Sequence, residues 1–416
     1  MPARVRPPGK VISYSNYGVA LAGYIVEVIA GIPFEDYIEQ NIFKPLGMEH
    51  SSFREPLPAA LAPDMSVGYT YKNGLFKAED FELFNGYPAG SASVCATDMA
   101  KFMIAHLQNG QFGDQRILKE ETAKLMHTRL FTHDPRIAGN AHGFWEADFN
   151  GLHLIEHGGD TLYFHSQLAL IPEKNLGWFV SYNSPNGPAR EELFEAFLNR
   201  YYPLATPRPE LKALPDSAQR LKQISGTYGS AEGSYKTFEK FVDLLMTRKA
   251  SPTKEGNLLM GARQYVEIEP FVFQQLEGQD KIVFKTDASG RITYAFGDPY
   301  SAMVKLTWYQ TPTFHYFLLG FCVFLFISAV LGWPLAALSR ILCRRKCEGV
   351  AAPKVARWLA GVMSGLFVVF LLCVLGAVSN RKALMVGVPP LLKFGLALPL
   401  IAALLGVGVL FYMFKA

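Results

Sequence analysis

Cysteine is scarce in this chain, which limits how its N-terminal part can be stabilised. Five cysteines occur among 416 residues, and only Cys95 precedes the apolar C-terminal region. A single thiol cannot form an internal disulfide, so this part must rely on core packing. Cys343 and Cys347 have neither a histidine nor a second cysteine pair beside them, so the sequence predicts no metal site there.

Charge is absent from three long stretches near the C-terminus. No Asp, Glu, Lys or Arg occurs for 34, 23 and 21 residues in the ranges 306–339, 358–380 and 394–414. About 20 apolar residues suffice for a helix to cross the hydrocarbon core of a bilayer. We therefore predict a multi-pass membrane region over residues 313–416, with the lipid bilayer as its partner. Its transmembrane helices are expected near residues 313–339, 358–380 and 392–414.

Basic residues next to these stretches predict how the chain is oriented. Six Lys or Arg lie in the loop 340–357, where the only acid is Glu348. An excess of Lys and Arg marks cytoplasmic loops. We therefore expect this loop in the cytoplasm and residues 1–305 outside it. A transporter is disfavoured, because Lys393 is the only candidate for an interior charge within the spans.

The net charge of +4 becomes informative once it is divided along the chain. Residues 340–416 hold ten Lys or Arg and one acid, which leaves 30 basic and 35 acidic residues for the rest. The part before the spans is therefore mildly acidic, and it lacks the positive footprint that nucleic-acid binding requires. No nucleic-acid partner is expected.

The spacing of apolar residues predicts a region of mixed helices and strands over residues 1–202. Apolar residues recur at helical spacing from Tyr17 to Ile29, and Gly31 is placed to end that helix. Further along, Asp98 is the expected N-cap of a second amphipathic helix. Two buried strands should follow before the region ends.

A proline-rich segment separates this region from a part with strand-like alternation. Residues 203–215 contain four prolines and form the predicted linker. Residues 216–309 then alternate between apolar and polar side chains and predict a small all-β domain, either a barrel or a sandwich. The clearest strands are expected at 265–269, 281–285 and 291–296.

Two short motifs carry side chains that suit acyl transfer. Tyr14-Ser15-Asn16 opens the first predicted helix, and His157-Gly158-Gly159 follows about 140 residues later, before a predicted strand. Acyl transfer by a serine needs a nucleophile, a base for its proton, an oxyanion hole and groups that hold the substrate. Each motif alone is weak, since Tyr71-Lys72-Asn73 repeats the first at a predicted hairpin turn.

Further landmarks in the same order make the combination specific. Residues 5–200 resemble the serine β-lactamase and penicillin-binding-protein superfamily, in its class C and esterase-like branch. The resemblance implies an α+β fold, an antiparallel sheet with helices. Residues 1–202 would then be a partial β-lactamase/DD-peptidase-like domain. The other landmarks are Pro7-Pro8-Gly9-Lys10, Phe43–Met48, Ser51-Ser52-Phe53, Pro88-Ala89-Gly90, Thr97–Phe102 and Glu156–Asp160.

The resemblance also implies roles for the motif residues. Tyr14 would relay protons, with its pKa depressed by a neighbouring lysine. Asn16 would offer its amide to a substrate carbonyl, and His157 would orient the phenol or meet a substrate carboxylate. The backbone N–H of Asp160 would supply half of the oxyanion hole. Substrate-binding positions are expected at Gly158 and Gly159, where a substrate backbone can lie along the strand.

The superfamily's first signature, a Ser-x-x-Lys that carries the nucleophile, is missing ahead of Tyr14. Literal matches occur at Ser251–Lys254 and Ser379–Lys382, but both follow the other signatures and are rejected. The first ten residues also lack the apolar segment of a signal peptide. These two absences lead us to expect an N-terminally truncated chain that is inactive as given.

Two functions fit these observations. The first is a membrane-anchored serine hydrolase that acts through an acyl-serine on an ester, amide, peptide or β-lactam, with a small-molecule or cell-wall-derived peptide substrate. The alternative is a non-catalytic membrane-anchored binding or sensor protein that uses the same β-lactamase-like site. No cofactor is expected. No zinc site is expected either, because His142, His153 and His165 lack a ligand spacing such as His-x-x-x-His.

Overall fold

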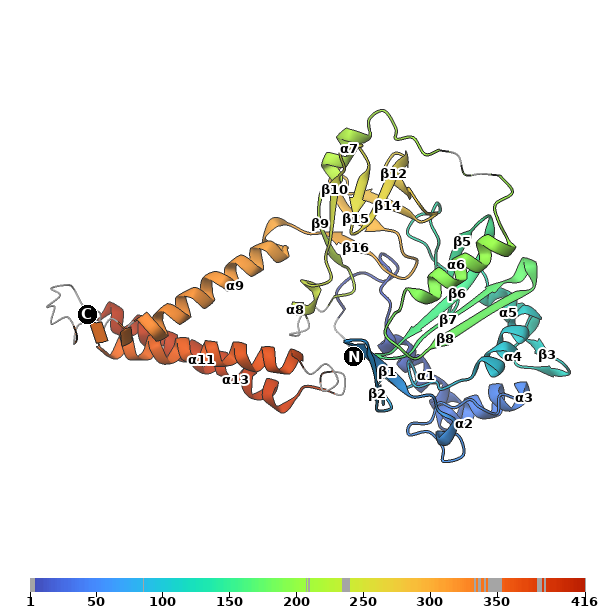
Figure 1. The fold of residues 1–416 in the computed structure, drawn as a ribbon, viewed down its shortest axis with the longest axis horizontal. Coiled ribbons are helices and arrows are strands. Elements are labelled where there is room, and N and C mark those ends of the chain that lie inside the picture. The colour runs from blue at the N-terminus through green and yellow to red at the C-terminus, as the bar shows by residue number, and fades with distance from the viewer. Residues whose placement is uncertain are drawn as a thin grey trace. The chain divides into compact units, whose positions relative to one another are not determined.

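The computed structural model (Figure 1) divides the chain into two compact units, Met1–Thr307 and Trp308–Ala416. Each unit is described by itself below. The described residues are 4–84, 86–206, 208, 210–233, 240–332, 334–335, 338–339, 342, 354–379, 384 and 387–415.

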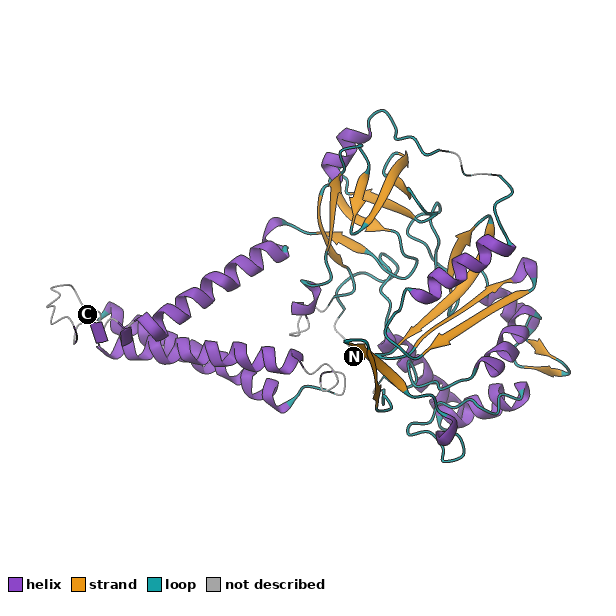
Figure 2. Ribbon diagram, in the orientation of Figure 1, coloured by secondary structure: helices purple, strands orange, loops and turns teal. Residues whose placement is uncertain are grey.

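An antiparallel sheet of four strands lies at the centre of the first part of unit one (Figure 2). Asn150 and Gly151 have positive φ angles of 50° and 78° and make the tight turn between its first two strands. In space the strands follow their order in the sequence: β5 (Trp145–Phe149), β6 (Leu152–Asp160), β7 (His165–Ile171) and β8 (Leu176–Tyr182).

Helices cover both faces of this sheet. Leu168 and Leu170 of β7 are buried with side chains of α4, whereas Ala169 and Ile171 are buried with side chains of α6. Successive strand residues point to opposite faces, so one buried strand serves two layers. The predicted α+β arrangement is confirmed. The covering helices are α4 (Ala96–Leu107) and α6 (Ala189–Tyr201).

The first predicted helix is confirmed, but the predicted cap of α4 is wrong. α1 (Asn16–Ala30) ends at Gly31, whose φ is 71° and whose N–H donates to Glu27 O at 2.9 Å. At α4, Cys95 rather than Asp98 occupies the cap position. The Asp98 carboxylate instead accepts hydrogen bonds from His50 and Ser51, so it is not available to cap the helix. The elements after α1 are α2 (Phe34–Ile38), a π-helical turn (Glu39–Phe43) and α3 (Lys44–Leu46).

Eight strands after the proline-rich segment close into a barrel, so the all-β prediction is confirmed and a barrel is chosen over a sandwich. α7 (Ser217–Ile224) buries Leu221 and Ile224 in the barrel core. The barrel and the sheet lie in the same compact unit, and the division at residues 203–215 stays a prediction. The strands are β9 (Gly226–Ser230), β10 (Arg248–Pro252), β11 (Leu258–Met260), β12 (Arg263–Glu269), β13 (Val272–Gln275), β14 (Lys281–Thr286), β15 (Ile292–Phe296) and β16 (Met303–Lys305).

Shorter elements complete unit one. β1 (Gly68–Lys72) and β2 (Leu75–Glu79) are joined by Asn73 and Gly74, whose φ angles of 53° and 82° make the expected hairpin turn. The remaining elements are the 3-10 turns Ala62–Asp64 and Pro172–Lys174, β3 (Gln111–Phe112), β4 (Gln115–Arg116), α5 (Glu120–Met126) and α8 (Lys240–Asp243).

Among the described residues of unit two, three helices are long and apolar enough to cross a membrane, as predicted. α11 and α13 pack together where Cys373 meets Gly395, since a Cβ on that glycine would lie 2.7 Å from the Cys373 side chain. The predicted cytoplasmic loop 340–357 lies outside the described residues except for 342 and 354–357. Cys343 and Cys347 lie outside them too. The helices are α9 (Pro312–Ile327) with its π-helical end (Ser328–Gly332), α11 (Lys354–Ser379) and α13 (Pro390–Phe414), and a 3-10 turn (Trp308–Gln310) precedes them.

Candidate active site

The start of α1 places the first motif. Ser15 is the N-cap in extended conformation, and its Oγ accepts a hydrogen bond from Gly18 N–H at 3.0 Å. This cap satisfies a backbone donor that the first helical turn leaves free. Tyr14 therefore lies just outside the helix, and Asn16 is its first, exposed residue.

The second motif occupies the end of β6. Strand β5 pairs with β6 only as far as Glu156, opposite Trp145, whereas residues 157–160 pair with β7 alone. Among the described residues, no strand pairs with the other edge of residues 157–160. We call this edge the open strand edge. Within the part of the chain that the structure describes, and leaving aside the two chain neighbours of Gly159, no atom lies within 4 Å of the position where this glycine would carry a Cβ. This edge has the shape that a substrate backbone needs for pairing as an added strand.

The fold brings the two motifs together. The rings of Tyr14 and His157 lie with their centroids 6.2 Å apart and their planes at 47°. His157 Nδ1 lies 2.7 Å from Gly158 O, and because a carbonyl only accepts, this nitrogen carries the proton. Burial lowers the pKa of His157, so the ring is neutral at pH 7 and Nε2 is left as an acceptor.

Tyr14 has the opposite pKa shift from the one that the resemblance implied. Burial raises the pKa of this phenol above its ordinary value of 10. A depressed pKa requires a cation beside the hydroxyl, and the implied lysine belongs to the Ser-x-x-Lys signature that the sequence does not supply before Tyr14. In this chain Tyr14 is therefore a neutral donor at physiological pH.

Arg190, which the sequence did not point to, anchors the same strand end. Its guanidinium binds the Asp160 carboxylate and also donates to Gly159 O and Ser166 O, both at 3.2 Å. His165 Nδ1 approaches the same carboxylate at 2.6 Å. Burial would raise the pKa of Asp160, but the hydrogen bonds from Arg190 and His165 outweigh it and lower the pKa. Asp160 is thus held as a carboxylate, which fixes the strand end around its backbone N–H.

Trp145 is a second residue that the motifs did not reveal. Its ring lies 4.1 Å from the His157 ring, tilted by 32°. Opposite Trp145 on the neighbouring strand, the half-buried Glu156 carboxylate accepts from the Gln167 amide at 3.0 Å, and burial raises its pKa despite this hydrogen bond. The Trp145 ring presents an apolar face to the imidazole.

The rejected Ser-x-x-Lys matches have no catalytic geometry. Ser251 lies on strand β10, paired with Leu259, and Lys254 follows in the turn, so they do not occupy adjacent turns of a helix. Ser379 ends α11, where its Oγ donates to Gly376 O at 2.8 Å. Lys382 lies outside the described residues.

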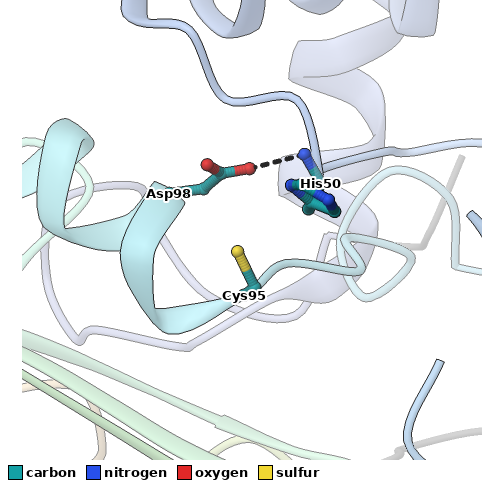
Figure 3. A group of neighbouring side chains, drawn as sticks. All are labelled: His50, Cys95 and Asp98. Carbon is teal, nitrogen blue, oxygen red and sulfur yellow. Dashed lines mark hydrogen bonds between the residues drawn. The ribbon is translucent and has the colours of Figure 1, made fainter. Parts of the chain in front are cut away.

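Among the described residues, one group has donor atoms close enough to consider for a metal: His50, Cys95 and Asp98, within 4.8 Å of one another (Figure 3). Asp98 Oδ2 accepts from the backbone N–H of His50 at 2.8 Å and from Ser51 Oγ at 2.9 Å. Asp98 Oδ1 accepts from the Lys101 ammonium at 3.0 Å. These donors already use the carboxylate and neutralise it, which suits a structural link between α4 and the loop at residue 50 better than a cation site.

Comparison with known proteins agrees with these motifs. The sequence profile named Beta-lactamase matches residues 2–198. Penicillin-binding protein 4 of Amycolatopsis lactamdurans is 28% identical over 240 residues, which are 55% of this chain and 62% of that protein. A protein of Escherichia coli K12, provisionally named D-alanyl-D-alanine carboxypeptidase, is 26% identical over 44% of this chain and 48% of its own length. This chain thus spans less than two thirds of these relatives.

Among solved structures, the octameric penicillin-binding protein homologue from Pyrococcus abyssi is similar, with 20% identity, a TM-score of 0.42, and 72% of this chain and 66% of that one covered. Residues 2–198 of this chain match the β-lactamase family, and this resemblance rests on the sequence matches.

Proposed function

We propose that this protein is a membrane-anchored serine hydrolase that forms an acyl-serine on an ester, amide, peptide or β-lactam. The observation that carries the proposal is the contact between Tyr14 and His157 beside the open strand edge at Gly159. A peptide ending in D-alanine is the substrate class to test first, because one relative bears the name of a D-alanyl-D-alanine carboxypeptidase.

Each residue of the site has a role in this proposal. The substrate backbone lies along Gly158 and Gly159, and the backbone N–H of Asp160 donates to the developing oxyanion. His157 Nε2 accepts from the Tyr14 hydroxyl and orients it towards the nucleophile. The amide of Asn16 donates to a substrate carbonyl. The nucleophile and its lysine come from a Ser-x-x-Lys segment outside these 416 residues.

The outer surface of α1 supports such a segment. Tyr24, Ile25, Val28 and Ile29 are exposed, and Ile29 retains 81% of its accessible surface. Exposed apolar area costs roughly 25 cal/mol per Å², so a cluster of this kind favours a covering partner. A helix bearing Ser-x-x-Lys and packed along α1 would bury these side chains.

Covalent labelling tests the hydrolase proposal. The chain as given is incubated with a fluorescent penicillin and with a fluorophosphonate, and we expect no label. A longer product of the same gene that contains an upstream Ser-x-x-Lys should be labelled at that serine, and a Ser→Ala variant should not. Label that maps to Ser13, Ser15 or Ser251 of the given chain would contradict the proposal.

Tyr14→Phe tests the relay in that longer form. The substitution keeps the ring and removes only the hydroxyl, so the melting temperature should change little. Loss of a proton relay lowers kcat by about 10²–10⁴-fold. Tyr71→Phe, from the second Tyr-x-Asn sequence on β1, is the matched control and should retain full activity. Equal kcat for Tyr14→Phe and the native enzyme would remove this residue from the mechanism.

A non-catalytic binding or sensor protein is the second candidate, favoured by the absence of an acceptable Ser-x-x-Lys from the sequence. It predicts that the given chain binds diacetyl-lysyl-D-alanyl-D-alanine without releasing D-alanine. Binding would be followed through the side-chain NMR signal of His157, with His157→Gln to assign that signal.

A further inference from the structure

The barrel reaches the candidate active site through two loops, residues 230–233 after β9 and residues 297–302 between β15 and β16. Ala231 N–H donates to Ala302 O at 2.8 Å, which joins the two loops. Both alanines are only 1% exposed, and they belong to a buried cluster that also contains Ile137 from outside the barrel. The two loops therefore behave as one packed edge.

This edge binds the segment that leads to the first motif. The Arg6 guanidinium donates to Ala231 O. Two residues before Tyr14, Ile12 N–H donates to His133 Nε2 at 3.0 Å, and the His133 ring stacks on Phe296 of β15 at 3.9 Å. The segment that leads to Tyr14 is therefore held by the barrel on one side and by the N-terminus of α1 on the other.

The second loop binds the strand region around the second motif. The side-chain amide of Asn140 donates to Pro299 O, and Asn140 pairs with Trp145 through an isolated bridge. The next residue in the loop, Tyr300, places its ring 4.7 Å from the Trp145 ring at 45° and 6.5 Å from the Tyr14 ring at 70°. Distances and angles of this kind are favourable for aromatic pairs.

Four rings are thus connected in one cluster, and one of them comes from the barrel. Trp145 and Tyr14 each contact both Tyr300 and His157. Burial, with the negative charges of Asp298, Glu191 and Glu156, raises the pKa of Tyr300 to about 12. Tyr300 therefore stays neutral at physiological pH and cannot serve as a general base there.

We propose that Tyr300 is a positioning residue that the barrel contributes to the candidate active site, where its ring braces Trp145 and Tyr14 and so fixes the His157 imidazole between them. The barrel then supplies a side chain that positions other residues of the candidate active site. The proposal rests on the proposed function only in naming the site catalytic, because the brace itself can be measured in the chain as given.

The pKa of His157 reports whether the brace exists. Burial is the main cause of its lowered pKa, and the hydrogen bond to Gly158 O acts in the opposite direction. Among the described residues, the rings that contact the imidazole are those of Tyr14 and Trp145, Tyr300 contacts both of these rings, and Glu156 precedes His157 on β6. Removing the Tyr300 ring admits water, so the His157 pKa should rise towards its ordinary value of about 6.5.

The test is an NMR titration of the full chain in detergent micelles with ¹³C-labelled histidine, the His157 signal being assigned with His157→Gln. In Tyr300→Ala the His157 pKa should rise. In Tyr300→Phe, which keeps the ring, it should match the native chain. Tyr294→Ala removes another barrel tyrosine, which stacks on Phe296 instead, and it should leave the His157 pKa unchanged.

Asn140→Ala is the second variant, in case Tyr300→Ala disturbs the barrel. It removes the hydrogen bond to Pro299 without deleting a core side chain, and it should raise the His157 pKa in the same direction. An unchanged His157 pKa in Asn140→Ala and in folded Tyr300→Ala would overturn the proposal. A rise in Tyr300→Phe equal to that in Tyr300→Ala would also overturn it, since the hydroxyl rather than the ring would then matter.

Kinetics of the longer form that contains the Ser-x-x-Lys segment distinguish failure of this proposal from failure of the proposed function. In that form, Tyr300→Ala should lower kcat more than it raises KM, because a displaced imidazole weakens the stabilisation of the transition state more than it weakens substrate binding. If penicillin labels no form of the protein, the hydrolase proposal fails while the His157 titration still decides the brace.

Discussion

Arg190 and Asp160, thirty residues apart in the chain, bind each other through two parallel hydrogen bonds, Nη1–Oδ1 at 2.7 Å and Nη2–Oδ2 at 2.9 Å. The arginine side chain is only 11% exposed, whereas the Asp160 side chain is 52% exposed. Arg190 also donates to two backbone carbonyls, so one guanidinium from α6 joins the ends of β6 and β7. The proposed oxyanion donor and the open strand edge therefore depend on a residue outside every motif.

Arg190→Ala should destabilise the end of β6. It removes the Arg190 hydrogen bonds to Asp160 and to two carbonyls and leaves His165 as the remaining side-chain partner of Asp160, and hydrogen bonds to charged groups contribute about 1.5–3 kcal/mol. Because Asp160 is half exposed and recovers hydration, we expect a loss of about 1–2 kcal/mol. Hydrogen exchange of the β6 and β7 amides measures it. Lys124→Ala, which breaks the exposed Lys124–Glu120 pair on α5, is the control and should leave exchange unchanged.

Acid should destabilise unit one through His106. This side chain is 2% exposed on α4, its Nδ1 lies 3.2 Å from His127 Nε2, and burial followed by the His127 charge lowers its pKa to about 4. Because the pKa is lowered in the folded state, the unfolded chain gains its proton first, and stability is lost as the pH falls from 6.5 towards 4. At about 1.4 kcal/mol per pH unit, this amounts to about 3 kcal/mol.

The measurement for His106 is the free energy of unfolding in urea at pH 7, 5.5 and 4, followed by near-ultraviolet circular dichroism. His106→Gln should flatten the slope between pH 6.5 and 4 while lowering stability at pH 7 through lost packing. His153→Gln is the control, because the pKa of His153 is raised, chiefly by the hydrogen bond to Asp148. An unchanged slope in His106→Gln would contradict the assignment.

A second buried histidine, His133, should make the backbone just before Tyr14 sensitive to low pH. His133 Nε2 accepts from Ile12 N–H at 3.0 Å, its ring stacks on Phe296 at 3.9 Å, and burial with the Lys285 charge lowers its pKa to about 4. Protonation converts Nε2 into a donor, so the hydrogen bond to Ile12 breaks near pH 4. Exchange of the Ile12 amide, corrected for its intrinsic pH dependence, should accelerate there. In His133→Ala it should be fast already at pH 7.

Sidedness of the membrane is predicted from charge and can be checked directly. The six basic residues of 340–357 predict a cytoplasmic location for that loop, so Lys305, just before the first span, should lie outside. A reporter that is active only in the cytoplasm, fused after Lys305, should stay inactive, and one fused within the loop should be active. The reverse pattern would show that the orientation is wrong.

Local patterns predicted many individual elements of this protein. Gly31 ends α1 because only a residue tolerant of positive φ continues the chain there, and Asn73-Gly74 turns the first hairpin for the same reason. The prediction failed at Asp98, where a carboxylate suited to a cap binds His50 and Ser51 across a loop. A cap and a distant partner compete for the same oxygen atoms, and the sequence does not contain the distance that decides between them.

The sequence by itself determined the three long apolar helices, three strands of the later barrel, and the identity and order of the motif residues, because these depend on composition and on periods of two or 3.6 residues. Only the tertiary structure decided that Arg190 binds beneath Asp160, that Trp145 faces His157, and that Tyr300 from the barrel joins Tyr14. Such contacts depend on how a sheet twists and where a closed barrel presents its loops. Those are properties of the packed chain as a whole, which no short window of residues encodes.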